Sequence, residues 1–142
     1  MSDNVITLIR RSAIGDFGAH RALAELAIAA GLEATDNGEN AFNPYYEASI
    51  FSRMAAASGA LADRARLMGV LAICAELASQ DGNDEESDVY VAESLAIAEL
   101  VADGDDAEAS EYAARIIANS ASQCSHEQLM RAKEFKQVWG QA

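Results

Sequence analysis

The sequence predicts an all-α fold of about seven helices in one domain, residues 1–142. Alanine is abundant and proline occurs once, in a chain with only four phenylalanines, four tyrosines and one tryptophan. That composition favours close-packed helices over a β-sandwich. At three places in the chain, a glycine separates two alanine-rich amphipathic segments. These glycines are Gly15, Gly59 and Gly104, which are 44 and 45 residues apart. Self-similarity at this period predicts stacked antiparallel hairpins, because one hairpin cannot bury its apolar face alone.

The first predicted hairpin lies before residue 31. Its first helix should begin near residue 2 or 3 and end at Gly15, with an apolar stripe made of Val5, Ile6, Leu8 and Ile9. The second should occupy residues 18–30, where apolar residues recur every three or four positions, and Gly31 should close it. Residues 31–43 have turn chemistry without periodicity, so we expect a loop of thirteen residues there.

The second hairpin should follow directly. Asn43 is suited to cap a third helix and Pro44 to occupy its first position, where the missing N–H donor costs nothing. This helix should run to about residue 57. The fourth is predicted over residues 60–78, with small residues on neighbouring turns that permit close packing.

The last three helices are separated by acidic or polar breaks. Residues 80–87 should form an acidic loop, after which Ser87 or Asp88 caps a fifth helix that ends near residue 103. A sixth is expected over residues 106–121. The seventh should begin at Ser125, since Ser125 and Gln128 fit a capping box. Its basic residues are suited to offset the acidic part of the chain or to cap the array.

Two strings in the middle of the chain carry a family resemblance. The first joins Tyr46-Glu47-Ala48 to Ala55-Ala56-Ala57-Ser58-Gly59, and the second is Ala65-Arg66-Leu67-Met68-Gly69-Val70-Leu71. They resemble the Sel-one-like class of tetratricopeptide-related repeats, in which an Ala-Ala-x-x-Gly turn joins two helices and small residues let them cross closely. The resemblance covers residues 44–75. The segments after Gly15 and Gly104 are similar but less close, with different turn spacings and intervals longer than the usual repeat.

The resemblance implies an adaptor whose concave surface receives a peptide or helix of a partner. The first helix of each pair would form that surface, which places it on residues 18–30, 60–78 and 106–121. An irregular helical bundle is the alternative fold, because alanines at helical spacing occur in any tight bundle.

The negative charge is concentrated in one segment. The formal net charge is −13, and residues 67–114 contain thirteen carboxylates and no lysine or arginine, while the rest of the chain is neutral. Such a segment attracts basic protein surfaces and disfavours nucleic acid and anionic membranes. Its alternative role is to keep an alanine-rich protein in solution. The sequence shows no signal peptide or membrane-spanning run, so we expect a cytoplasmic protein that binds neither nucleic acid nor membrane.

These observations define a set of candidate partner-binding residues. The aromatic ones cluster at the end of the predicted loop, where the alternative is a hydrophobic staple between two helices. The acidic ones flank the fifth helix. The full set is Phe42, Tyr45, Tyr46, Asp84, Glu85, Glu86, Asp88, Asp105, Asp106 and Glu108.

No constellation predicts catalysis, a cofactor or a metal. Cys124 and His126 supply two ligands where a structural zinc site needs four, and the acidic loop at 81–86 has Glu86 where a calcium loop requires glycine. We therefore expect a non-catalytic protein-interaction module, a helical-repeat adaptor. The alternative is an acidic inhibitor or immunity-type protein that blocks a basic enzyme. In either case the partner is another protein, and the sequence leaves homo-oligomerisation open.

Overall fold

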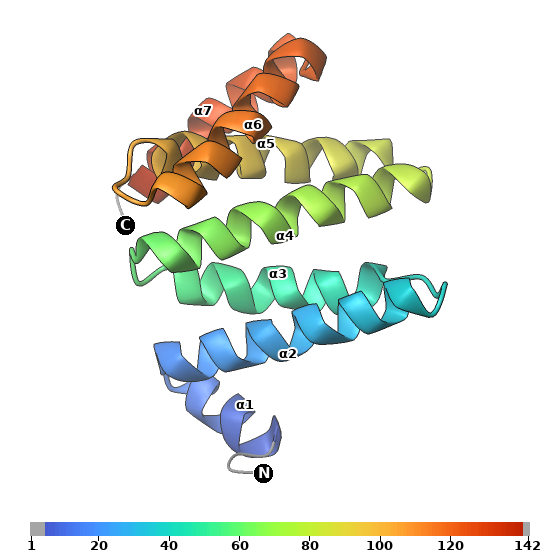
Figure 1. Ribbon diagram of the computed structural model, residues 1–142, viewed down its shortest axis with the longest axis vertical. Helices are drawn as coiled ribbons and strands as arrows, with labels where there is room; N and C mark the ends of the chain where they lie inside the picture. Colours follow the sequence, from blue (N-terminus) through green and yellow to red (C-terminus); the bar gives the residue numbers. More distant parts are fainter. Residues whose placement is uncertain (1–4, 141–142) are drawn as a thin grey trace.

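A computed structural model describes residues 5–140, which form seven α-helices and no strand (Figure 1). The predicted all-α class is confirmed. The helices are α1 Val5–Ala13, α2 Phe17–Asp36, α3 Phe42–Ala56, α4 Leu61–Gln80, α5 Asp84–Ala102, α6 Ala107–Gln123 and α7 His126–Gly140. The predicted start of the first helix, at residue 2 or 3, lies outside the described residues.

Consecutive helices pack on each other from α1 through α5, and α2 to α5 lie side by side in antiparallel order (Figure 1). The pattern changes after α5. Both α6 and α7 pack on α5, and they do not pack extensively on each other although they overlap in Figure 1. In a regular stack of hairpins α7 would pack on α6 as α3 packs on α2. The repeat array of the Sel-one-like class stays a prediction.

In the turn after each of the helices α1 to α4, one glycine has a backbone conformation in the left-handed region. These residues are Gly15, Gly38, Gly59 and Gly82, with φ between +71° and +86°, at intervals of 23, 21 and 23 residues. Glycine adopts this conformation without the steric penalty of a Cβ. Gly104 differs, since its φ is not positive and a Cβ there would lie 2.8 Å from the Leu61 side chain. Along the first 82 residues, a glycine of this kind therefore lies in every turn between helices. The sequence pattern of Gly15, Gly59 and Gly104 marked only every second turn.

Gly31 lies inside α2, so the predicted helix end at residue 30 and the predicted loop over 31–43 are wrong. The helix continues to Asp36, and only residues 37–41 connect it to α3. The reason is a tertiary contact: the ring of Tyr45 packs so closely on Gly31 that a Cβ there would lie 2.6 Å from Cε2. Gly31 is a point of close approach between α2 and α3, and not a helix terminus.

The predicted acidic loop over residues 80–87 and the predicted cap at Ser87 or Asp88 are also wrong. The helix α5 begins at Asp84, and Ser87 is buried within it, where its hydroxyl donates to the Ala75 carbonyl at 2.7 Å. Three acidic residues, Asp84, Glu85 and Glu86, occupy the first turn. The helix dipole favours carboxylates at that position.

The other helix starts agree more closely with the sequence. The helix α3 begins at Phe42, whose N–H donates to Asn40 Oδ1 at 2.9 Å, so Pro44 falls in the first turn and Asn43 is not the cap. At α7 the predicted capping box is present: Ser125 N–H donates to Gln128 Oε1 at 2.7 Å, and Gln128 N–H donates to Ser125 Oγ at 3.2 Å.

Ion pairs connect helices that are next but one in the chain, and two of them involve a buried carboxylate. Arg21 of α2 pairs with the buried Asp63 of α4 at 2.8 Å. Arg53 of α3 pairs with the buried Glu93 of α5, also at 2.8 Å. Between the helices lies one main apolar core, and its largest fully buried apolar side chains are Leu67, Met68, Leu71, Ile97 and Val101. Within residues 5–140, no helix combines the length and the apolar character needed to cross a bilayer.

Candidate protein-binding cleft

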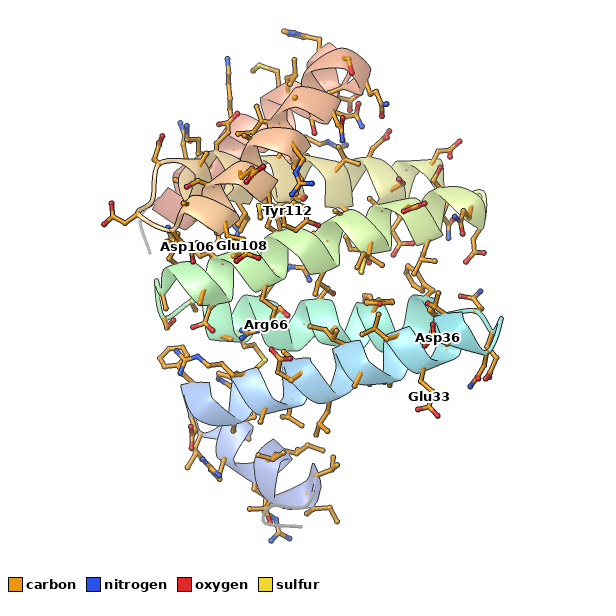
Figure 2. The ribbon with its side chains drawn as sticks, in the orientation of Figure 1. Glu33, Asp36, Arg66, Asp106, Glu108 and Tyr112 are labelled. Carbon is orange, nitrogen blue, oxygen red and sulfur yellow. The ribbon has the colours of Figure 1, made fainter. Side chains whose placement is uncertain are left out.

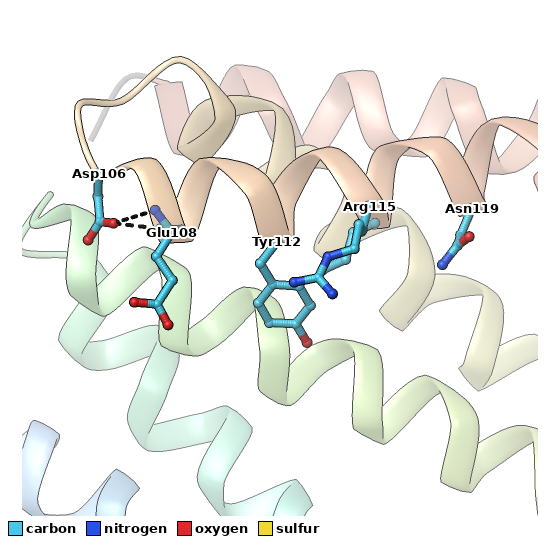
Figure 3. Close-up of a pocket in the computed structure, with 7 residues that line it drawn as sticks. Asp106, Glu108, Tyr112, Arg115 and Asn119 are labelled. Atoms are coloured by element: carbon cyan, nitrogen blue, oxygen red, sulfur yellow. Dashed lines mark hydrogen bonds between the residues drawn. The ribbon is translucent and has the colours of Figure 1, made fainter.

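An open cleft of about 710 Å³ separates the second half of α4 from the second half of α6. Its floor is α5, and the first turn of α7 closes one end. The two walls meet near the start of α6, where Tyr112 lies over Gly69 of α4; a Cβ at Gly69 would be 3.5 Å from the Tyr112 hydroxyl. Beyond this contact the two helices diverge (Figure 3). The cleft is therefore produced by the angle between α4 and α6.

Alanine and serine make up six of the fifteen described residues that line the cleft, and its charged residues are carboxylates. Ala72, Ala75 and Ser94 leave room above the floor. Glu76 of α4 and Asp88 of α5 are the charged lining residues, and no lysine, arginine or histidine is among the described residues that line the cleft. Electrostatically this space suits a positively charged side chain.

The polar groups of the floor are already engaged within the protein. Ser87 donates to the Ala75 carbonyl at 2.7 Å, and Ser94 donates to the Met68 carbonyl at 3.0 Å. Asp88 accepts a hydrogen bond from Gln128 Nε2 at 2.9 Å, which ties α5 to α7. Glu76, in contrast, is exposed at the rim. The hydroxyls of Ser87 and Ser94 therefore donate within the protein, whereas the carboxylate of Glu76 is accessible at the rim.

A second depression of about 620 Å³ lies on α6 and shares Ile116 and Asn119 with the cleft. Figure 3 shows Glu108 and Tyr112 on the side of α6 that faces α4. The Arg115 guanidinium lies 5.8 Å from the centre of the Tyr112 ring, within the range of a cation–π contact. Asp106 caps α6 by accepting from the N–H groups of Glu108 and Ala109 at 3.0 and 3.1 Å. The depression extends the cleft along α6.

The acidic candidates do not form one face. Asp84, Glu85, Glu86 and Asp88 lie at the start of α5, whereas Asp105, Asp106 and Glu108 lie beyond its end, at the start of α6. A helix of 19 residues separates the groups by roughly 28 Å, at 1.5 Å per residue. Of the seven, Asp88 lines the cleft and two others, Asp106 and Glu108, line the adjoining depression. Glu86 is half-buried and accepts the Tyr90 hydroxyl at 3.0 Å.

Part of the negative charge of residues 67–114 is offset by bases from outside that segment. Glu93 pairs with Arg53, and its carboxylate also accepts from Trp139 Nε1 at 3.2 Å. Glu99 pairs with Lys136 of α7 at 3.1 Å. The final helix thus neutralises some of the acidic segment, as its basic residues suggested. The charge that remains for a partner lies at the cleft rim and at the two helix starts.

The three aromatic candidates have different environments, and none lines the cleft. Tyr45 is only 4% exposed and packs on Gly31, so the sequence-based assignment of this residue to a partner surface is wrong: it is a core residue. Burial raises the pKa of its hydroxyl. Phe42 and Tyr46 stack with their ring centres 6.0 Å apart, and Tyr46 remains exposed.

Sequence reasoning missed Glu76 and the small residues of the floor. The available signal for Glu76 was its position at the end of the apolar run from Leu67 to Ala75. Cys124 also lines the cleft and is half-buried, while Cys74 is fully buried, and both are free thiols. Burial raises the pKa of Cys74 to about 12 and also raises the pKa of Cys124. Among the residues that the structure describes, no group of three or more potential ligands is placed to hold a metal ion.

Comparisons with known proteins add no identification: the chain matches no protein-family model, and no curated protein or solved structure is detectably similar to it. The resemblance to Sel-one-like repeats therefore rests on residues 44–75 alone and stays a prediction.

Proposed function

We propose that this protein is a non-catalytic protein-interaction module that binds a lysine- or arginine-bearing segment of another protein in the cleft between α4 and α6. The observation that carries the proposal is the lining of the cleft, which contains two carboxylates and no base. Cytoplasmic function is part of the same proposal and accords with two free thiols.

The shape of the cleft supports a peptide or helix as the ligand. Small residues of the α4 wall and the α5 floor, among them Ala72, Ala75 and Ser94, leave space for the larger side chains of a partner. Burial of those side chains would supply most of the affinity, since an exposed ion pair contributes only about 0.2–1 kcal/mol. The carboxylates would chiefly set the orientation of the partner and its rate of association.

An acidic inhibitor of a basic enzyme is the second candidate function. Its support is the cluster of exposed carboxylates at Asp84 and Glu85, one turn before Asp88 on the edge of the cleft. A surface that works through these charges binds much less tightly at high salt, because exposed charges are screened. Binding through the apolar side chains of the cleft, such as Ala72, Val91 and Ile116, changes little with salt.

The test is affinity capture with the intact chain and two matched variants. The cleft variant carries Glu76→Gln and Asp88→Asn. The control carries Glu33→Gln and Asp36→Asn, which remove the same charge from α2, away from α6 (Figure 2). We expect a basic protein that the wild-type chain and the control retain equally and that the cleft variant retains more weakly, because each exposed ion pair contributes about 0.2–1 kcal/mol. Equal retention by the cleft variant would contradict the proposed site.

Repeating the capture at low and high salt separates the two candidate functions. The adaptor is supported by a partner that remains bound at high salt and that the cleft variant, but not the control, binds more weakly. The inhibitor is supported by a partner that is lost at high salt from the wild-type chain itself and that also depends on Asp84 and Glu85.

A further inference from the structure

A second surface lies at the other end of the molecule from α6 and α7 (Figure 1). Both α1 and α3 pack on α2 without packing extensively on each other, which leaves a groove of about 450 Å³ above α2. Among the residues that the structure describes, eight line it, and of these Glu47 alone is charged. The lining consists of Val5 and Ile9 from α1, Leu23, Leu26 and Ala27 from α2, and Glu47, Ile50 and Phe51 from α3.

The walls of this groove are mainly apolar, and several of their side chains are substantially exposed. Val5, Ile9 and Leu26 are each about half exposed, at 51%, 50% and 49%, and Ile50 is 39% exposed. Ile6, beside them on α1, is 61% exposed. A continuous apolar surface of this kind marks an interaction site more often than free surface. A helix at the end of a stack normally carries a polar outer face, whereas the exposed residues of α1 include Val5, Ile6 and Ile9.

We propose that the groove between α1 and α3 is the interface of a homodimer, in which a second copy of this chain covers the same groove of the first. The distribution of charge supports a second copy as the occupant. Residues 5–56, which include α1 to α3, contain six carboxylates and four arginines, whereas residues 67–114 contain thirteen carboxylates and no base. Two copies that meet through α1 to α3 bring nearly neutral surfaces together.

The same arrangement keeps the strongly acidic parts apart. The helices α5 and α6 lie at the end of the molecule opposite α1, so they would lie at the far ends of the pair (Figure 1). Any contact through the acidic end would bring like charges together, which is unfavourable. A contact in which both copies use the same groove is isologous and closes after two chains, so it yields a dimer and not a fibre.

This inference does not depend on the proposed function, since the cleft and the groove share no lining residue. The two also respond differently to salt. Added salt screens the repulsion between two acidic chains and leaves apolar contacts intact, so the dimer should persist or strengthen. Binding of a basic segment in the cleft should not strengthen.

Sedimentation equilibrium of the full chain over a wide concentration range tests the dimer. We expect the mass to rise from 15.0 kDa toward twice that value as the concentration increases. Ile50→Glu, in the groove, should remain monomeric at every concentration. Ile73→Glu on α4 is the matched control, because the same substitution is made at similar exposure, 36% against 39%, outside the groove. It should dimerise like the wild-type chain.

Two results would overturn the proposal. One is a wild-type chain that stays monomeric at all concentrations, which would leave the groove to an amphipathic helix of a different protein. The other is a dimer that Ile50→Glu and Ile73→Glu affect equally. Circular dichroism of both variants establishes that they are folded, and Ile9→Glu in α1 provides a second groove variant should Ile50→Glu unfold.

Discussion

At the scale of single residues, two glycines inside helices have different surroundings. Gly31 faces the Tyr45 ring, and a Cβ there would lie 2.6 Å from ring carbon Cε2. Gly69 faces Tyr112, and a Cβ there would make an ordinary contact of 3.5 Å. Alanine is a better helix former than glycine by about 1 kcal/mol, so the sign of each substitution depends on the space available.

We expect Gly31→Ala to destabilise the protein and Gly69→Ala to be neutral or stabilising. Overpacking costs about 1–3 kcal/mol, which exceeds the propensity gain at Gly31. Gly69 has no such cost, so a gain of up to about 1 kcal/mol remains. Urea unfolding of the two variants measures both free energies. Equal effects at the two positions would contradict the close contact at Gly31.

Asp63 should make folding stability depend on acid pH. This carboxylate is 1% exposed, and it accepts hydrogen bonds from Arg21 and Arg66 and from the Ser58 hydroxyl, all at 2.8–3.0 Å. Figure 2 shows Arg66 reaching from α4 toward α2. Burial alone would raise the pKa of Asp63, but the hydrogen bonds outweigh it and lower the pKa from 3.8 to about 2.

Because the folded-state pKa is below the unfolded one, the contribution of Asp63 is fully present above about pH 4 and is lost as the pH falls toward 2. Asp63→Asn should lose about 1–3 kcal/mol at neutral pH, since it removes hydrogen bonds to charged groups. It should also flatten the pH dependence in that window. Denaturant unfolding across the acid range measures this, and an unchanged pH profile would show that other carboxylates dominate.

The two thiols should react at very different rates. Cys124 is half-buried at the cleft, while Cys74 is 0% exposed and its thiol donates to the Tyr45 carbonyl at 3.4 Å. Ellman's reagent should therefore modify one thiol in the native protein and the second only on unfolding. Cys124→Ser should remove the fast phase and Cys74→Ser the slow one. Fast modification of Cys74 would contradict its place in the core.

At the scale of helices, local sequence signals identify those features that are themselves local. The capping box at Ser125 and the seven helices follow from hydrogen-bonding side chains and apolar spacing. The errors occur where a residue is held by a distant partner. Gly31 stays helical against Tyr45, and Ser87 stays helical because its hydroxyl bonds to Ala75 of the preceding helix. No pattern within residues 31–43 contains that information, whereas the carboxylates of Asp84, Glu85 and Glu86 are a local signal for the start of α5.

The candidate site could be predicted only in part for the same reason. Asp88, Asp106 and Glu108 belong to the charged segment and were identified as candidates from it. The cleft itself arises because α4 and α6 separate beyond the contact of Tyr112 with Gly69. The angle between two helices is a tertiary property, so the importance of Glu76 is visible only in the structure.

The capping box allows a prediction about α7 as an element. Ser125→Ala removes the acceptor of the Gln128 N–H, and the loss of such a cap costs about 0.5–2 kcal/mol. Ser122→Ala is the control, because that hydroxyl donates only to the Asn119 carbonyl on the exposed side of α6. Thermal unfolding should show a lower midpoint for Ser125→Ala than for Ser122→Ala. Equal midpoints would mean that α7 does not depend on its cap.

At the scale of the whole molecule, the two surfaces lie at opposite ends of the stack. The groove on α1 to α3 is mainly apolar and its helices are nearly neutral, whereas the charged residues of the cleft on α4 to α7 are acidic. A dimer formed through the grooves would carry two clefts directed away from each other. Such a pair could hold two basic segments at once and so gain avidity for a partner that carries more than one.

The order in which the helices pack also bears on how the chain acquires its structure. Apart from α7 on α5 and a minor contact of α6 on α4, each extensive contact joins helices that are neighbours in the chain. Proteins with such local contacts fold in microseconds to milliseconds. A helix of 20 residues takes roughly one to four seconds to synthesise at ribosomal rates. Each helix up to α5 can therefore pack on its predecessor before the next helix has left the ribosome. The helix α7 differs because its main partner is α5 and not its predecessor α6, so the surface of α5 that it covers stays open until α6 has also been made.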